Sequence, residues 1–181
     1  MILRLATFAA FAAGLAWSGN ALAAWKTVAV GDLSLRYDDS IWSQQSAAPP
    51  SLLRLRCIAG ACSQDNVVTF VRDDRPLIAP GFGAFGPGAV TGATVDLRIQ
   101  SLTPGSRVLA RHPALPVDAG GSTGYRGLYD IQDRALARTG AVIMLMRLPT
   151  ASVEIRMGAS RLSSDDIAAF DRLMSGLALQ N

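Results

Sequence analysis

The stretch Ala141–Leu148 constrains the fold more than any other part of this sequence. It reads A-V-I-M-L-M-R-L, an almost unbroken apolar run that contains β-branched residues. A strand with one face in water alternates apolar and polar residues, so this run predicts a strand that is covered on both faces. We therefore expect it near the centre of a sheet.

The sequence that follows predicts a hairpin and a closing helix. After a turn at Pro149, Val153–Met157 alternates apolar with polar residues, which is typical of a strand with one wet face. Ser163–Asp166 then supplies a capping side chain and first-turn acids. Apolar residues recur from there at helical spacing: Ile167, Phe170, Leu173, Met174 and Leu177. We expect this C-terminal helix to cover the sheet.

The rest of the chain predicts further strands and one short helix, Ala93–Leu102, with Asp96 and Arg98 pointing outward. Ser43–Ser51 is interpreted as a polar connection. The other expected strands are Trp25–Val30, Leu33–Tyr37, Leu52–Cys57, Asn66–Arg72, Arg107–Arg111, Leu115–Asp118 and Tyr125–Ile131. The predicted fold class is α+β, an antiparallel β-sheet of about six to eight strands covered by a C-terminal helix and a shorter mid-chain helix.

Residues 1–23 are typical of a secretory signal peptide. Arg4 precedes an apolar run, and Ala21-Leu22-Ala23 has the small-x-small pattern of a cleavage site. An uncleaved membrane anchor is the alternative. We expect residues 24–181 to form a single globular α+β domain in the periplasm or outside the cell, with no integral membrane span after signal removal.

The charge balance and the cysteines bear on partners. Of 17 basic residues, one lies in the leader, so 16 basic residues remain beside 14 acids, and a net charge of about +2 is too weak to indicate a nucleic-acid partner.

In an oxidising compartment Cys57 and Cys62 most simply form a disulfide. A redox centre would favour C-x-x-C, and a metal site needs more ligands than these and His112 offer. No metal or cofactor is expected.

Two groups of residues are candidates for binding a partner. Asp73–Gly92 is a long glycine- and proline-rich loop that carries Phe82 and Phe85, which could anchor a partner or cap the core. Arg54 and Arg56 share one face of a predicted strand and could offer a cationic surface to acidic ligands, with Arg36 and Arg72 possible neighbours. A solvated sheet face explains them equally well.

Two motifs match a catalytic or cofactor-binding sequence pattern but lack the flanking strand and helix that the pattern requires. Gly81–Gly86 fits G-x-G-x-x-G, but prolines flank it where a strand and a helix are required. Gly120–Gly124 fits the nucleophile elbow G-x-S-x-G, yet a predicted strand follows it where that motif requires a helix. Catalytic triads are recognised by their geometry and not by the order of their residues in the sequence. A small secreted serine hydrolase that uses Ser122 and His112 is for this reason kept as the alternative function.

The adjacent acid pairs are expected in turns and at helix starts, where Asp accepts local backbone hydrogen bonds. These pairs are Asp38-Asp39, Asp73-Asp74 and Asp165-Asp166.

The order of the predicted elements resembles the PsbP-like superfamily. The resemblance covers most of the chain after residue 23 and rests on an N-terminal hairpin, a mid-chain helix, an apolar hairpin and a closing helix. The residues that carry it are Tyr37 to Trp42, Tyr125-Arg126-Gly127, and Phe170, Leu173, Ser175 and Leu177. That superfamily includes an extrinsic subunit of the oxygen-evolving photosystem, a Ran-binding nuclear import factor and bacterial envelope proteins. The resemblance implies a sheet covered by helices and a role in binding without catalysis; it carries over no site residues.

The leading hypothesis is therefore an exported, non-enzymatic binding or accessory protein of the cell envelope with a protein partner there. A structural stress or secretion factor without a defined ligand is a third alternative.

Overall fold

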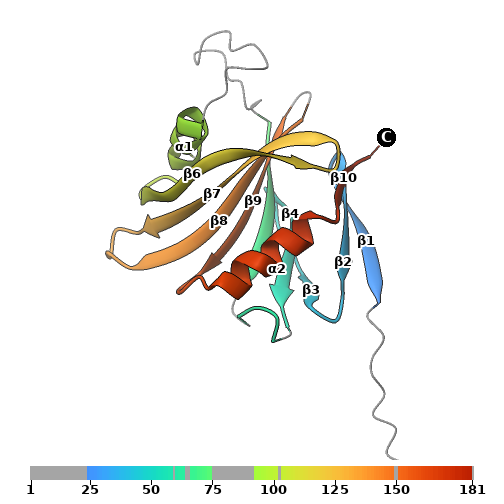
Figure 1. Ribbon diagram of the computed structural model, residues 1–181. Helices are drawn as coiled ribbons and strands as arrows, with labels where there is room; N and C mark the ends of the chain where they lie inside the picture. Colours follow the sequence, from blue (N-terminus) through green and yellow to red (C-terminus); the bar gives the residue numbers. More distant parts are fainter. Residues whose placement is uncertain are drawn as a thin grey trace, which may run out of the picture.

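A computed structural model of the chain describes residues 24–58, 60–63, 66–74, 92–101, 103–148 and 151–180 (Figure 1). These residues form a seven-stranded sheet of order β3-β4-β5-β9-β8-β7-β6 and a three-stranded sheet of order β1-β2-β10, both antiparallel. Two helices accompany them, one mid-chain and one C-terminal, so the predicted α+β class is confirmed. In chain order the elements are β1 (Trp25–Val30), β2 (Leu33–Asp38), β3 (Trp42–Gln45), β4 (Ser51–Cys57), β5 (Val67–Asp73), α1 (Gly92–Ser101), β6 (Arg107–Ala119), β7 (Ser122–Gln132), β8 (Arg138–Arg147), β9 (Ser152–Ala159), α2 (Ser164–Met174) and β10 (Leu177–Leu179).

The apolar run lies in β8, which is hydrogen-bonded between β7 and β9 inside the larger sheet. Its side chains alternate between two cores. Val142, Met144 and Met146 belong to the core beneath α2, and Ile143 and Leu145 belong to the core beneath α1. Both faces of β8 are therefore covered, as the sequence predicted.

Helix α2 and the small sheet close one face of the large sheet (Figure 1). Ser163 is the N-cap of α2 and forms a capping box with Asp166, as its position predicted. The expectation that Leu177 continues the helix is wrong. At Gly176 the backbone passes so close to β2 that an added Cβ would lie 2.0 Å from the carbonyl oxygen of Arg36. The chain leaves the helix there, and Leu177 begins β10, which pairs with β2.

Helix α1 covers part of the opposite face, where Val95 and Ile99 join the core formed with β7 and β8. The predicted outward direction of Asp96 and Arg98 is wrong. Arg98 is buried and forms an ion pair with Asp73, the last residue of β5. The carboxylate of Asp96 accepts a hydrogen bond from the Tyr129 hydroxyl at 2.6 Å. These charges face inward because each has a partner on the sheet.

Two strand predictions need correction. The segments around His112 form one strand, β6, whose register shifts between Ala110 and His112 and again between His112 and Leu115. Such irregularities accommodate Pro113, which has no N–H to donate, at the edge of a sheet. The polar connection from Ser43 begins within β3, a strand too short and too polar to show alternation.

The wet face expected for β9 is also covered, since Glu154 is only 7% exposed beside α1. No helix among the described residues is long and apolar enough to cross a membrane.

Candidate functional site

The first candidate site is a hollow on the face of the large sheet that α1 leaves uncovered. Leu53, Leu55 and Cys57 of β4 point into the core, so Arg54 and Arg56 point outward. The register places Gln45 of β3 beside Arg54, and together with Ser46 and Val67 these residues line a hollow of about 370 Å³. We call it the arginine hollow.

The arginine hollow is cationic. Its described lining contains two arginines and no carboxylate. Because Arg54 and Arg56 are two residues apart on one strand, their backbones are roughly 7 Å apart and both side chains leave the same face. The two neighbours suggested for them lie elsewhere. Arg36 stacks on the ring of Trp25, and Arg72 pairs with Asp74.

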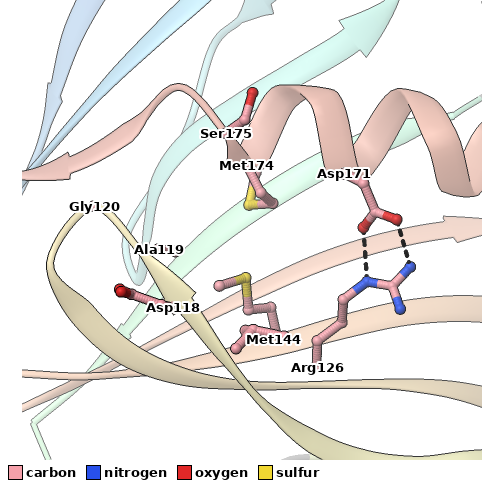
Figure 2. Close-up of a pocket in the computed structure, with 9 residues that line it drawn as sticks. Asp118, Ala119, Gly120, Arg126, Met144, Asp171, Met174 and Ser175 are labelled. Carbon is pink, nitrogen blue, oxygen red and sulfur yellow. Dashed lines mark hydrogen bonds and ion pairs between the residues drawn. The ribbon is translucent and has the colours of Figure 1, made fainter.

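The second candidate is a pocket of about 280 Å³ between the β6–β7 hairpin and the end of α2, here called the α2 pocket (Figure 2). Figure 2 shows Asp118 and Gly120 on the hairpin side and Met174 and Ser175 on the helix side, with Met144 of β8 between them. The two methionines are buried and provide an apolar floor.

An ion pair borders the α2 pocket. Arg126 of β7 and Asp171 of α2 meet through two contacts, Nε to Oδ1 at 2.7 Å and Nη2 to Oδ2 at 2.9 Å (Figure 2). The Nη2 contact is a hydrogen bond and the Nε contact is part of the ion pair, and together they connect the helix to the sheet. Arg126 faces α2 because Tyr125 and Gly127, its neighbours on the strand, face α1.

The disulfide bond joins Cys57 to Cys62 with a Cα–Cα distance of 6.2 Å, as predicted. The residues that follow this disulfide are attached to α2 by Asp166. That fully buried carboxylate accepts the backbone N–H groups of Ser63 and Ser163, each at 2.8 Å, and the side-chain amide of Asn66. Burial acts to raise the pKa of Asp166, but the hydrogen bonds from Ser63 and Ser163 outweigh it and the pKa lies below its ordinary value.

A second group of buried charges lies between α1 and the sheet. Glu154 pairs with Arg156 at 2.7 Å, and Arg156 also donates to Thr103 at 3.0 Å. Burial raises the pKa of Glu154, and the attraction of Arg156 opposes that rise. Burial and the hydrogen bond to Asp96 likewise raise the pKa of Tyr129. We interpret this group as the attachment of α1, because each carboxylate already has a partner.

The geometry does not bring together the two residues of the hydrolase alternative. Ser122 pairs with Ala119 at one end of the β6–β7 ladder, whereas His112 pairs with Leu128 further along. Leu128 lies six positions along β7 from Ser122, which is roughly 20 Å at 3.3 Å per residue. The Ser122 hydroxyl donates to the backbone oxygen of Arg147 at 2.7 Å. Ser122 and His112 therefore do not form a catalytic pair in this fold.

The remaining sequence candidates have different outcomes. Phe82, Phe85 and the glycine motif at 81–86 lie outside the described residues. Among the acid pairs, Asp38 has the expected turn role, since it accepts the N–H of Ser40 at 2.9 Å. Asp73 has a different role, because its carboxylate binds Arg98 of α1. Within the described ranges no cluster of His, Cys, Asp and Glu could hold a metal ion.

Sequence reasoning missed the pairing of Arg126 with Asp171 and the contacts of Asp166 with the disulfide loop. Both join segments that are far apart in the chain, so neither leaves a local pattern. The direction of Arg126 could have been inferred from the row of residues on the opposite face of β7.

No protein-family model and no curated protein matches this sequence. Among solved structures the chain is similar to cyanobacterial PsbP (CyanoP) from Synechocystis sp. PCC 6803, with 13% identity, 90% of this chain and 96% of that chain covered, and a TM-score of 0.56. LpqN of Mycobacterium tuberculosis, described as involved in cell envelope biogenesis, is 11% identical over 87% of this chain and 91% of that chain, with a TM-score of 0.48. The likeness to CyanoP shows the fold.

Proposed function

We propose that this chain, which has a PsbP-like fold, is an exported, non-enzymatic accessory protein of the cell envelope that binds a protein partner through the arginine hollow. The observation that carries the proposal is the pair Arg54 and Arg56, exposed two residues apart on one strand and lining the same hollow. Export is supported by the leader-like sequence of residues 1–23.

The chemistry of the hollow favours an acidic partner. Guanidinium groups bind carboxylates through two parallel hydrogen bonds, and arginine is enriched in protein interfaces. The described lining contains no carboxylate, and surfaces of opposite charge attract each other at an interface. An acidic surface with two carboxylates at strand spacing would match Arg54 and Arg56.

A binding role is favoured over the hydrolase alternative because the register separates Ser122 from His112. The fold alone does not decide the role, since one fold can carry many functions. Phe82 and Phe85 stay a prediction for a second contact surface.

Site-specific crosslinking in intact cells tests the proposal. A photoreactive amino acid is placed at Gln45, inside the arginine hollow, or at Leu136, which is 73% exposed between β7 and β8. We expect one dominant protein adduct from Gln45 and none of the same mass from Leu136. Equal adducts from both positions would indicate unspecific contact and contradict the proposal.

A charge-reversal pair sharpens the test. Arg54→Glu with Arg56→Glu should abolish the adduct from Gln45. Arg107→Glu with Arg161→Glu changes the net charge equally at two other exposed arginines and should leave the adduct unchanged.

A further inference from the structure

A third hollow lies where β1, β2, β3 and α2 meet, and none of the sites described above includes it. It has a volume of about 140 Å³. We call it the Trp25 hollow, and six of the residues that line it are Trp25, Arg36, Tyr37, Trp42, Arg172 and Leu173. It is separate from the arginine hollow, because Trp42 and Gln45 of β3 point to opposite faces of the strand.

The floor of the Trp25 hollow is buried and largely apolar. Tyr37, Trp42 and Leu173 are each 3% exposed and belong to the core beneath α2. A cavity of about 150 Å³ with apolar walls holds one benzene molecule. The hollow therefore has room for one aromatic side chain.

The rim is built from residues that dominate protein interfaces. Trp25 is 56% exposed, although it is a large aromatic residue at the start of a strand. The guanidinium carbon of Arg36 lies 4.9 Å from the centre of its ring, which is a cation–π distance. Tryptophan, tyrosine and arginine are the residues most enriched among interface hot spots. A ring entering the hollow would meet a preformed aromatic edge.

The charge around the hollow is positive. Arg36 and Arg172 are exposed, and no carboxylate of the described chain forms a salt bridge with either. The acid at the rim, Asp38, accepts hydrogen bonds from the backbone and hydroxyl of Ser40. A carboxylate beside the inserted ring would thus find two guanidinium partners.

From this geometry we propose that the Trp25 hollow is a second binding site, which takes one aromatic side chain flanked by carboxylates from an acidic segment of a partner protein. The site does not depend on the arginine hollow, because it uses other residues on another face. Insertion of the ring buries the exposed side of Trp25, and the flanking carboxylates pair with Arg36 and Arg172.

The test uses the full chain as it accumulates in cells and a fluorescein-labelled, capped pentapeptide with phenylalanine between two pairs of glutamates. Fluorescence anisotropy should show saturable binding. Trp25→Ala and Arg172→Ala should each weaken binding at least tenfold, and replacing the central phenylalanine of the probe with alanine should do the same. Arg161→Ala, at an exposed arginine outside the hollow, should change nothing.

Two controls separate this proposal from the others. Arg54→Ala with Arg56→Ala should leave the probe affinity intact, whereas it would remove binding that belongs to the arginine hollow. Vesicles of anionic phospholipid test a membrane role for Trp25, and binding to them in place of the peptide would overturn the proposal. Absence of saturable peptide binding at millimolar concentration, or equal binding by Trp25→Ala, would overturn it as well. Urea denaturation of each variant confirms that it is folded.

Discussion

The carboxylate of Asp166, in the first turn of α2, accepts the backbone N–H of Ser63 at 2.8 Å, one residue after the disulfide-bonded Cys62. The same carboxylate caps its own helix through Ser163. The end of the β4–β5 hairpin and the start of the helix are therefore held by one buried group, 103 residues away from Ser63 in the chain.

Replacing Asp166 with asparagine should destabilise the protein by roughly 2 to 3 kcal/mol, because hydrogen bonds to a buried charged group are lost. The matched control is Asp165→Asn in the same turn, which is exposed and should cost less than about 1 kcal/mol. Urea denaturation measures both free energies of unfolding. Similar values for the two variants would show that the contacts of Asp166 contribute little.

The pH dependence of stability follows from the same group. The folded-state pKa of Asp166 lies below its ordinary value, so its ionised form is favoured by folding. The resulting stability is fully present above the unfolded-state pKa, near 3.8, and is lost as the pH falls through the folded-state pKa. The wild type should therefore lose its stability advantage over Asp166→Asn on acidification below about pH 4. A difference between the two proteins that stays constant with pH would argue against this assignment.

The disulfide should protect both cysteines from alkylation. In the unreduced, denatured protein neither Cys57 nor Cys62 should gain mass on treatment with iodoacetamide, and both should do so after reduction. Cys57→Ser with Cys62→Ser should lower the free energy of unfolding by about 2 kcal/mol, the expected effect of removing a short crosslinked loop. Modification of both cysteines without reduction would show that the bond is absent.

Two adjacent glycines of the β6–β7 turn offer a matched comparison. Gly120 and Gly121 both have positive φ, 60° and 80°, so alanine is strained at either position. Only at Gly120 would an added Cβ meet backbone, the Leu177 oxygen at 2.2 Å, whereas nothing lies within 4 Å at Gly121. Gly121→Ala should cost about 1 kcal/mol. Gly120→Ala should cost at least about 2 kcal/mol, because the turn must also move off β10. Equal melting temperatures for the two variants would contradict the close backbone contact between Gly120 and β10.

Most of the fold could be predicted because its elements have local patterns. The apolar run of β8 marked a strand covered on both faces, and Ser163 with its following acids marked the start of α2 within a residue. The second sheet could not be predicted. It depends on Leu177, which does not continue the helix but pairs with β2. The chain leaves the helix at Gly176, where its backbone contacts Arg36, a residue far away in the sequence.

The candidate sites were harder to predict, because charged side chains on a predicted helix or strand were expected to point into the solvent. The partner of Arg98 is Asp73 on another element, and alternation along a helix cannot show such a partner. Glu154 pairs with Arg156 on its own strand, but alternation does not show that α1 covers this face. Arg54 and Arg56 were placed on one face correctly, since strand alternation alone determines it. The hollow that they line also needs Gln45 of β3, a strand whose four residues gave no signal.

The most direct test of the binding role is the yield of the Gln45 crosslink in cells, compared across three variants of the same protein. The account predicts that Arg54→Glu with Arg56→Glu lowers the yield at least tenfold, and that Ser122→Ala and His112→Ala leave it unchanged. An unchanged yield in the arginine variant, together with loss of a measurable hydrolytic activity in Ser122→Ala or His112→Ala, would contradict it.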